Sequence, residues 1–577
     1  EARTLLKSAC IGCIELLDGI EAAAALKPRS VDANVIVADC DAASPLASNW
    51  LPSLRHARAS LLAPGAAVVP RALTVYASLV ESEALASLGC VWQDATHGLD
   101  LRPLNALAHG SRAVRLSELP HSLLTDAAVA LRLELDGAEP PAESGEATTE
   151  LVARRAGVAH AVVLWHDLDL GGDASVSTAP GEAGDARQVV LFLRAAGAGA
   201  ESDLGVELRD GQHVHLRLRW QPPREPEVEL YDDATTPTTP LGASLPEAPR
   251  LGEQNAAGAS RPLFEYHFAM LNDTERTAAF ATALEHAVRE ARPSLAVDIG
   301  AGSGLLAMLA ARAGAPRVLA LEMTAEIAAL ATRLVAAHGL DDRVRVLPMH
   351  SSALDLGSDA AGGDAWAARA ELLVFEVLGT DPLCEGLLPS LRHARASLLA
   401  PGASVVPRAL TVYASLVESE ALASLGCVWQ DATHGLDLRP LNALAHGSRA
   451  VRLSELPHSL LTDAAVALRL ELDGAEPPAE SGEATTELVA RRAGVAHAVV
   501  LWHDLDLGGD ASVSTAPGEA GDARQVVLFL RAAGAGAESD LGVELRDGQH
   551  VHLRLRWQPP REPEVELYDD ATTPTTP

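Results

Sequence analysis

Basic residues, cysteines and long apolar runs are all scarce in this sequence of 577 residues. Its 45 lysines and arginines stand against 78 acidic residues, which gives a formal net charge of −33. Direct binding to nucleic acid is therefore not expected, because it needs a basic surface that displaces counterions from phosphates. Docking on an anionic membrane surface is disfavoured for the same reason. An acidic chain instead attracts basic partners.

Six cysteines are too few for a disulfide framework in a chain of this length. They fit a reducing compartment, so we expect the protein in the cytoplasm and/or the nucleus. Cys10 and Cys13 form one C-x-x-C pair, but no second pair follows at zinc spacing, and we expect no metal site. We expect no secretory signal, and each long apolar stretch carries a charge or is shorter than the ~20 residues that span a bilayer.

What the sequence does contain is a long internal repeat. Residues 51–240 recur at 388–577, and Ala67 against Ser404 is the one difference. Each copy holds 15 arginines, no lysine and 26 acidic residues, so the two copies supply −22 of the net charge of −33. Solenoid repeats are only 20–50 residues long, whereas here a whole domain is copied. A recent duplication or a joined gene model explains this as well as a selected two-copy architecture does.

The segment between the copies carries most of the candidate chemistry. Its pattern predicts strands at 294–300, 317–322, 343–349 and 371–377, and helices at 273–291, 304–314 and 324–339. Asp273 is the predicted N-cap of the first helix. Because strands and helices alternate, we expect a doubly wound α/β fold with a parallel sheet.

The copied segment has a different pattern. Short β-rich runs are separated by turns, and a helical stretch is predicted at 436–468 and again at 99–131. This pattern predicts an antiparallel β-barrel or sandwich with a helical insertion, present twice in the chain.

A glycine-rich turn follows the first predicted strand. Asp298 ends the strand, and Gly300, Gly302 and Gly304 follow it, while Glu322 ends the second strand. Glycines let the backbone approach a ligand, and an acid at that distance can accept hydrogen bonds from ribose hydroxyls. The pattern predicts a site for an adenosine-containing cofactor. The alternative is an ordinary tight turn between strand and helix.

Two glutamates follow the fourth predicted strand. Glu376 ends it, and Glu385 comes nine residues later with apolar residues around both. Such a pair repels unless a cation lies between the carboxylates, and a guanidinium matches carboxylates through paired hydrogen bonds. The alternative is a pair of solvated loop acids.

These motifs together resemble the protein arginine N-methyltransferase family over residues 261–558. The matching pieces are HFAMLNDTER at 267–276, VDIGAGSG at 297–304, ALE ending at Glu322, the double-glutamate loop, VVPRALTVYASLVES at 405–419 and STAP at 514–517. The likeness is closest to the tandem-domain branch, which includes type II and type III members.

The resemblance implies a Rossmann-like methyltransferase domain followed by a β-barrel, with S-adenosyl-L-methionine as cofactor. Glu376 and Glu385 would clamp the substrate guanidinium. The implied cofactor contacts are Arg276 to the carboxylate, Asp298, Gly300, Gly302 and Gly304 around the methionine portion, Glu322 at the ribose, His350, Ser351 and Ser352 near the adenine, and His267 and Met270 at the reacting centre.

The implied function is methyl transfer to arginine in arginine-rich basic protein substrates. The helical arm implies a homodimer or an intrachain pseudo-dimer. Two alternatives are kept: a catalytically impaired scaffold that binds cofactor and partners without turnover, and a methyltransferase for a small molecule.

Two departures from the family bear on activity. Asp522 and Ala523 stand where the family has a His-Trp pair in a loop that walls the substrate pocket. In the first half of the chain, Asp39 and Ser48 stand where Glu376 and Glu385 stand in the second. We therefore expect no activity in the first half.

These patterns predict six parts of the chain. They are a truncated, degenerate Rossmann-like remnant at 1–50, the first β-barrel at 51–220, a proline-rich linker at 221–260, the S-adenosylmethionine-binding domain at 261–405, the second barrel with its helical arm at 406–558, and a polar tail at 559–577.

Overall fold

The fold is known from a computed structural model. It describes residues 33–38, 44–92, 96–108, 110–137, 139, 141–182, 186–199, 202–232, 240–245, 265–354, 356, 366, 368–384, 386–428, 438–445, 447–518, 524–532 and 541–569. The chain divides into two compact units. Unit 1 comprises residues 1–14, 94–101 and 273–577, and unit 2 comprises residues 15–93 and 102–272.

Unit 1 contains the expected parallel sheet. Its strand order is β18-β17-β16-β19-β20, and every neighbouring pair is parallel. The strands are β16 (Ala296–Ile299), β17 (Val318–Leu321), β18 (Val344–Leu347), β19 (Ala370–Phe375) and β20 (Leu399–Val406). All four residues of β16 and of β17 are buried, which is why these runs are apolar throughout.

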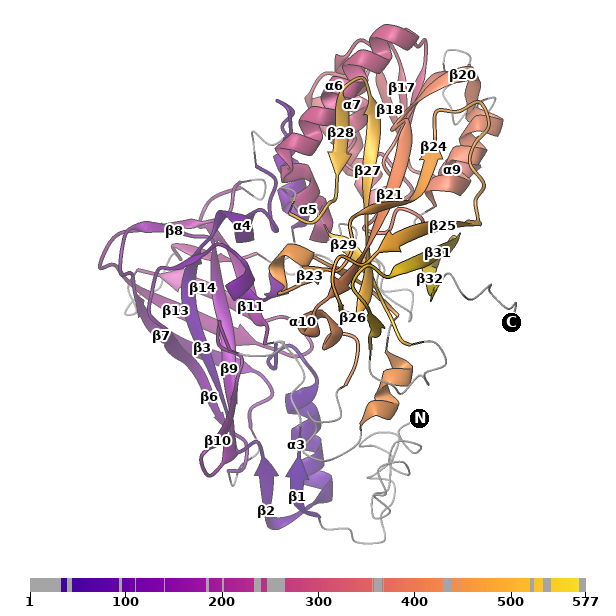
Figure 1. Ribbon diagram of the computed structural model, residues 1–577. Coiled ribbons are helices and arrows are strands. Elements are labelled where there is room, and N and C mark those ends of the chain that lie inside the picture. The colour runs from indigo at the N-terminus through magenta and orange to yellow at the C-terminus, as the bar shows by residue number, and fades with distance from the viewer. Residues whose placement is uncertain are drawn as a thin grey trace. The chain divides into compact units, whose positions relative to one another are not determined.

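Helices precede and connect these strands, with α6 before β16. They are α6 (Thr274–Ala291), α7 (Leu305–Arg312), α8 (Ala325–Ala337) and α9 (Leu387–His393). The side chain of Asp273 caps α6 by accepting a hydrogen bond from the Arg276 amide, as the sequence predicts. Figure 1 shows α6 alongside strands β27 (Ala498–Gly508) and β28 (Ala511–Ser514) of the second barrel, which it contacts.

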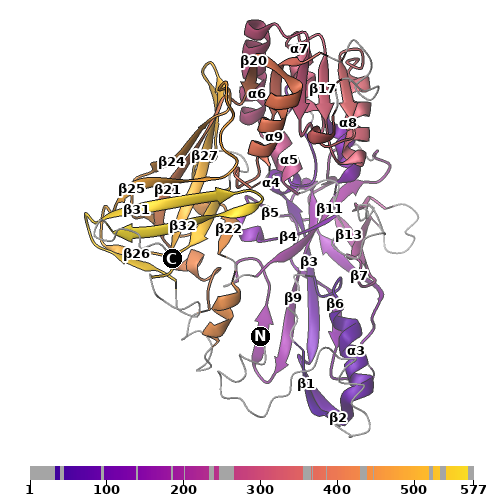
Figure 2. The same ribbon diagram turned by 90° about the vertical axis from the view of Figure 1, so that its right-hand side faces the viewer.

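The second barrel is antiparallel and also belongs to unit 1. A seven-stranded sheet and a three-stranded sheet, β25-β31-β32, form most of it (Figure 2). The remaining strands are β21 (Ala409–Glu418), β22 (Ser448–Val451), β23 (Ser459–Leu460), β24 (Ala465–Glu471), β25 (Gly482–Val489), β26 (Gly494–Ala496), β29 (Gln525–Phe529), β30 (Val543–Leu545), β31 (His550–Gln558) and β32 (Arg561–Asp569), with the short helix α10 (Glu420–Ala423).

Unit 2 holds the first barrel, in which an 11-stranded sheet predominates. Its strands are β3 (Ala72–Glu81), β4 (Ser111–Val114), β5 (Ser122–Leu123), β6 (Ala128–Glu134), β7 (Gly145–Val152), β9 (Ala161–Gly171), β10 (Ala174–Ser177), β11 (Gln188–Ala195), β13 (His213–Trp220), β14 (Glu227–Tyr231) and β15 (Gly242–Ser244). A separate pair joins β8 (Gly157–Ala159) to β12 (Val206–Leu208). Helices α4 (Glu83–Ala86) and α5 (Glu265–Asn272) complete the unit.

A small parallel sheet precedes the first barrel. Strand β1 (Ala33–Val37) pairs with β2 (Leu62–Val69), and helix α3 (Trp50–Leu61) lies between them in sequence. The same succession of strand, helix and parallel strand occurs in unit 1 as β19, α9 and β20. Residues 33–69 therefore repeat the last part of the parallel sheet of unit 1.

The structure corrects the expected helical arm. In the described part of 436–468 the only helical pieces are the 3₁₀ turns Arg439–Leu444 and Leu453–Glu455, and strands lie between and after them. Pro440 and Pro457 interrupt any longer helix, because proline lacks the amide hydrogen that a helix interior needs. The apolar run that follows alternates in burial and forms β24. The first copy shows the same turns and strands over 99–131.

Two predicted boundaries also differ from the structure. The polar tail at 559–577 contains β32, which pairs with β31, so the barrel extends beyond residue 558. The linker at 221–260 contains β14 and β15, which belong to the sheet of the first barrel. Acidic residues conceal β14 and β32, because they leave few apolar residues to alternate, and β15 is too short to show a pattern.

None of the helices in the described ranges is both long and apolar enough to cross a membrane. Within the same ranges, no group of three or more histidine, cysteine, aspartate or glutamate side chains is placed to hold a metal ion.

Candidate active site

The candidate site lies at one edge of the parallel sheet in unit 1. Because parallel strands end on the same side, the residues after β18, β17, β16 and β19 stand in a row in that order. The row consists of the His350 turn, Glu322, the glycine turn with Asp298, and Glu376. Four segments that are up to 78 residues apart in the sequence, from 298 to 376, thus share one edge.

The glycine turn has the backbone that glycine permits. Gly300, Gly302 and Gly304 have φ values of +75°, +52° and +80°, in the left-handed region that side chains disfavour. A Cβ on Gly300 would lie 2.5 Å from Cγ1 of Val377, so the turn packs tightly against the segment after β19. At Gly302 the nearest atom to a Cβ would be 4.0 Å away, which leaves the backbone there open to a ligand.

Glu322 is buried beside this turn. Its carboxylate accepts hydrogen bonds from the Gly302 amide at 3.0 Å and from the Thr324 amide at 2.8 Å. The Gly302 contact joins the acid to the turn. Carboxylate oxygens have further lone pairs, so Glu322 can also accept from ribose hydroxyls.

Asp298 is fully buried at the end of β16. Neither of its carboxylate oxygens has a hydrogen-bond partner of normal geometry among the described residues. Burial raises the pKa of Asp298 to about 7, the Ala307 amide opposes the rise, and the neighbouring Glu322 and Glu376 add to it. A buried carboxylate without a partner is suited to a cationic or hydrogen-bond-donating ligand group.

Arg276 and Glu376 form an ion pair. Nη2 of Arg276, in the first turn of α6, lies 3.1 Å from Oε2 of Glu376, and the two side chains are 12% and 17% exposed. The guanidinium also stacks over the ring of Phe280, at 4.9 Å from its centroid. Glu376 thus already binds a guanidinium group, here one from its own chain.

Burial disfavours the negative charge of Glu376, and the neighbouring Arg276 favours it. Burial raises the pKa of Glu376, whereas the charge and the hydrogen bond of Arg276 lower it. Without a cation at this position, the carboxylate would take up a proton more readily. The position of Glu376 therefore favours a bound cation.

The predicted adenine segment follows β18 as a single 3₁₀ turn, Ser351–Ala353. Nδ1 of His350 accepts from the Ser352 amide at 3.2 Å and lies 2.8 Å from the Ser352 hydroxyl. Ser352 is exposed and Ser351 is buried. The turn stands next to Glu322 in the row, on the side away from Glu376.

Several predicted residues lie outside the part of unit 1 that the structure describes. His267 and Met270 lie on α5, which belongs to unit 2, so their place at the reacting centre stays a prediction. Glu385 lies outside the described residues, as do Asp39, the Asp522-Ala523 pair and the C-x-x-C pair. Ser48 is described, and its hydroxyl is bonded to the carbonyl of Pro45 at 3.3 Å.

One residue of this region was not predicted from the sequence. Asp381 lies in the loop after Glu376, where its carboxylate accepts from the Leu383 amide and from the Cys384 thiol, both at 3.0 Å. Burial raises the pKa of Asp381. The sequence feature that points to Asp381 is the Asp-Pro pair at 381–382. This pair is typical of a turn, and the turn shapes the loop that carries the second glutamate.

The residues present fit S-adenosylmethionine. Asp298 offers an unpartnered buried carboxylate, Gly302 leaves its backbone open, and Arg276 offers a cation for the carboxylate of the cofactor. Glu322 supplies the acceptor for the ribose. Fold and site together define an α/β protein that binds an adenosine-containing cofactor at the carboxyl edge of its sheet.

A relative from Streptomyces achromogenes subsp. streptozoticus, named arginine N(omega)-methyltransferase, is 40% identical to this chain over 260 residues. The match covers 45% of this chain and 69% of the relative. The chain belongs to the arginine N-methyltransferase family. Searched against models of protein families, it matches none.

Relatives named protein arginine N-methyltransferase 7 are also similar. The one from Danio rerio is 30% identical over 255 residues, which are 42% of this chain and 37% of the relative. The one from Oryza sativa subsp. indica is 32% identical over 327 residues, which are 50% of this chain and 44% of the relative. The chain thus spans less than half the length of these two relatives.

Solved structures of similar proteins align more loosely. A Trypanosoma brucei PRMT1 enzyme-prozyme heterotetrameric complex with AdoHcy has a TM-score of 0.43 at 21% identity, covering 50% of this chain and 87% of that one. Arabidopsis thaliana protein arginine methyltransferase 10 has a TM-score of 0.42 at 17% identity, covering 54% and 95%.

Proposed function

We propose that this protein transfers a methyl group from S-adenosyl-L-methionine to the guanidinium of arginine in basic protein segments. The observation that carries the proposal is the ion pair between Arg276 and Glu376, because it shows a guanidinium bound at the end of the candidate cofactor site. The row His350, Glu322, Asp298, Glu376 has the order of the groups to be bound: adenine, ribose, methionine, substrate.

Each residue has a role that follows from its position. Arg276 would bind the carboxylate of the cofactor, Asp298 and the glycine turn its methionine portion, and Glu322 the ribose hydroxyls. The bound cofactor supplies an activated methyl group, so the protein contributes mainly orientation. Glu376 would hold the substrate guanidinium and draw its positive charge toward the nitrogen that it contacts. The remaining terminal nitrogen then becomes the better nucleophile.

Glu385 is the proposed second member of this clamp. Two carboxylates on one guanidinium would fix its plane as well as its position, because the five donors of the group are rigidly arranged. The loop from Glu376 to Glu385 is braced by Asp381, which bonds to Leu383 and Cys384 within it.

Basic protein segments are the proposed substrate class. The net charge of −33 favours their approach, although most of it comes from the repeated barrel.

Binding and transfer can be tested separately. Calorimetry should show one S-adenosylmethionine site per chain, and labelled methyl should then reach an arginine-glycine peptide but not its lysine-glycine counterpart. Cofactor binding without transfer to any peptide would contradict the proposal and favour a scaffold. Transfer to a small-molecule guanidine alone would contradict the substrate class.

Glu376→Gln gives the sharpest test at the level of one residue. The substitution keeps the shape of the side chain and removes its charge, so we expect kcat to fall on the order of 100- to 1000-fold. Cofactor affinity should change far less. The matched control is Glu290→Gln, on an exposed position of α6, which should leave kcat unchanged. If Glu376→Gln and Glu290→Gln have equal kcat values, Glu376 takes no part in the mechanism.

We further propose an intrachain pseudo-dimer. The repeat gives one chain two copies of the barrel with its arm, at 51–240 and 388–577, which supplies both halves of such a pair. Light scattering should give the mass of one chain, 60.1 kDa. Twice that mass would favour a homodimer instead.

The domain division and the location in the cell are proposals of the same kind. The six parts keep their predicted order, with β14, β15 and β32 added to the barrels. The low cysteine content, six in 577 residues, supports a reducing compartment and thus the cytoplasm and/or nucleus. Fluorescence microscopy of a tagged chain would test the location.

A further inference from the structure

A short turn with the same hydrogen bond occurs in both units. It comprises residues 381–384 in unit 1, before α9, and residues 44–47 in unit 2, before α3. In each turn the amide of the last residue donates to the carbonyl of the first, at 3.3 Å in unit 1 and 3.2 Å in unit 2. The leucines inside the turns, Leu383 and Leu46, are both 2% exposed. Each turn is therefore anchored by one buried leucine.

In unit 2 this turn lies at one end of the first barrel. Leu46 belongs to the same core cluster as Val75 of β3 and Leu164 of β9. A small cavity there is lined by Ser44 and Leu46 from the turn and by His166 from β9. The imidazole of His166 thus lies beside the turn, at the end of the barrel.

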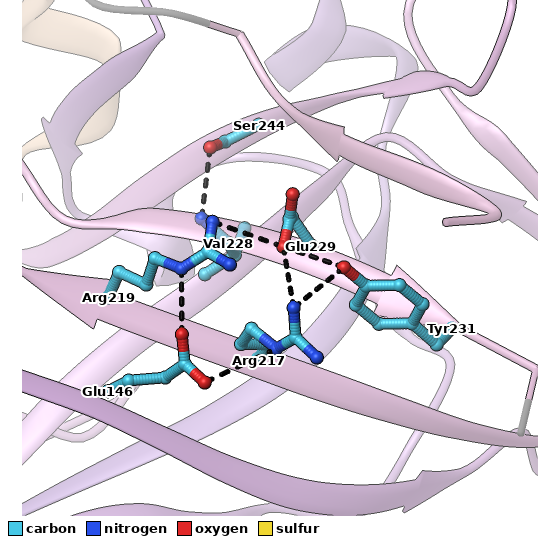
Figure 3. A network of polar contacts seen from close by, with 7 residues as sticks. All are labelled: Glu146, Arg217, Arg219, Val228, Glu229, Tyr231 and Ser244. Atoms are coloured by element: carbon cyan, nitrogen blue, oxygen red, sulfur yellow. Dashed lines mark hydrogen bonds and ion pairs between the residues drawn. The ribbon is translucent and has the colours of Figure 1, made fainter. Parts of the chain in front are cut away.

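Charged side chains of the first barrel otherwise lie on its outer face. Figure 3 shows two of them, Arg217 and Arg219 of β13, whose side chains are 21% and 43% exposed. Both pair with Glu146 of β7 and with Glu229 of β14, at distances from 2.8 to 3.6 Å. The residues that alternate with these arginines on β13 are buried, so the inner face of the strand is apolar.

His166 departs from this division between the two faces. Its neighbours two positions away on β9, Leu164 and Leu168, belong to the barrel core, so its side chain lies on the inner side of the sheet. It is 3% exposed. Placing a titratable ring in an apolar interior costs free energy, and such a group with a shifted pKa is a candidate for a functional role.

The segment after each turn is joined to its barrel in the same way. Arg395 in unit 1 donates to the Leu472 carbonyl at 3.3 Å, and Arg58 in unit 2 donates to the carbonyl of the matching Leu135. In unit 1 the turn itself is also bonded, because the Cys384 thiol donates to the first carbonyl of β32 at 3.2 Å. The turn of unit 1 therefore lies on the second barrel as its counterpart lies on the first.

His503 is the counterpart of His166 in unit 1. It stands opposite Val412 of β21, as His166 stands opposite Val75 of β3. Burial lowers the pKa of His503 to about 4, so the ring is neutral at pH 7. The Thr515 hydroxyl lies 3.4 Å from Nδ1 of this ring, which leaves Nε2 for the turn.

We propose that His503 is a positioning residue for methyl transfer. Its imidazole supports the turn 381–384 from inside the barrel and so fixes the course of the loop between Glu376 and Glu385. A neutral ring suits this place, because a cation there would compete with the substrate guanidinium for the glutamates. His503 has this role only if the loop holds a guanidinium, as the proposed function requires.

The substitution His503→Leu removes the polar atoms and keeps a side chain of similar size. We expect faster amide hydrogen exchange at Leu383 and Cys384, whose amides bond within the turn. The value of kcat/KM for an arginine-glycine peptide should fall about tenfold, while the affinity for S-adenosylmethionine stays the same. Unchanged exchange at both amides would overturn the proposal.

The matched control is His166→Leu, because the strands around the two histidines have the same sequence and the same pairing. It should lower the melting temperature as much as His503→Leu does and speed exchange at Ala47, but leave kcat/KM unchanged. An equal fall of kcat/KM in both variants would reflect lost stability alone, and the positioning role would be wrong.

Two further variants serve if His503→Leu does not fold. Glutamine places its amide near the position of Nε2, and asparagine places its amide near the position of Nδ1. We expect His503→Gln to keep most of kcat/KM and His503→Asn to lose about tenfold. The reverse order would show that the ring acts through Thr515 instead of the turn, which contradicts the proposal.

Hydrogen exchange also separates this proposal from the proposed function. If the unaltered chain transfers methyl to no peptide, the proposed function fails, and His503 loses its catalytic purpose. Exchange at Leu383 and Cys384 still shows in that case whether His503 supports the turn. If methyl transfer occurs and His503→Leu changes neither exchange nor kcat/KM, the proposed function stands and His503 is not a positioning residue.

Discussion

Arg276 has one guanidinium and two candidate partners. In this structure it pairs with Glu376, and in the proposed function it binds the carboxylate of the cofactor. Both partners are acidic groups in a partly buried region, so they compete for the cation. Arrival of the cofactor would draw Arg276 toward it and leave Glu376 ready for the guanidinium of the substrate.

Arg276→Met should therefore have two effects. Cofactor affinity should fall at least tenfold, because a charge-assisted hydrogen bond contributes about 1.5–3 kcal/mol. Arg276 lowers the pKa of Glu376 against the effect of burial, so its loss raises that pKa further. The acid limb of the pH–rate profile should then move to higher pH.

Arg289→Met, at an exposed position on the same helix, is the control for both measurements. If the affinity and the acid limb both match the wild type, Arg276 serves only the structure of α6.

The raised pKa of Asp298 predicts that the stability of the folded chain depends on pH. Its pKa is about 7 in the folded chain, against an ordinary value of 3.8. Between pH 4 and 7 the folded chain keeps a proton that the unfolded chain has released. Stability from this group therefore falls as pH rises through that window, by up to about 1.4 kcal/mol per pH unit.

The substitution Asp298→Asn should remove this loss of stability at rising pH, because asparagine does not titrate. The melting temperature of the variant should improve relative to the wild type between pH 5 and 7, whereas Asp342→Asn, at a position that is 77% exposed, should track the wild type. A constant difference between Asp298→Asn and the wild type across this range would show that Asp298 does not titrate there.

Sequence spacing is most informative about residues that are held by local structure. Gly300, Gly302, Gly304 and Glu322 belong to a strand, a turn, a helix and the next strand, so their spacing fixes where they lie. The contact between Arg276 and Glu376 joins positions that are 100 residues apart. It depends on how α6 packs beside β19, which no spacing specifies.

At the scale of elements, the parallel sheet was predictable and the arm was not. Short apolar strands alternating with amphipathic helices leave one plausible arrangement, and four of the five strands were expected. The fifth, β20, begins in Leu-Ala-Pro-Gly, where proline and glycine conceal a strand. The leucines and alanines of the arm favour a helix because they are strong helix formers, but tertiary pairing overrides propensity in such a segment.

The glycine turn gives a prediction at this scale. Gly300→Ala places a Cβ against Val377 and requires a left-handed backbone, so the turn should shift and cofactor affinity should fall at least tenfold. Gly339→Ala carries the same backbone strain, about 1–2 kcal/mol, with no atom within 4 Å.

Thermal unfolding should show similar losses of stability for the two variants, and calorimetry should show a loss of cofactor affinity for Gly300→Ala alone. A normal affinity for Gly300→Ala would mean that the turn does not shape the cofactor site.

At the scale of the whole molecule, charge predicts a response to salt. The net charge of −33 should speed the capture of basic peptides at low ionic strength. Raising salt from 0.05 to 0.5 M shortens the screening length several-fold, so kcat/KM for an arginine-rich peptide should fall on the order of tenfold.

A peptide with one arginine and no net positive charge is the control, and its kcat/KM should change little. The same fall for both peptides would attribute the effect to the active site instead of the field of the molecule.

The near-identity of the two barrels also has a consequence for how the chain folds. Strand β3 pairs with β9, and β21 pairs with β27, through the same residues in the same register. During refolding, β3 can pair equally well with β27, since nothing in the sequence of either strand distinguishes the copies. Such exchanged pairs are compact and slow to separate, so a fraction of refolding chains should be trapped in them, while a chain with a single barrel escapes this trap.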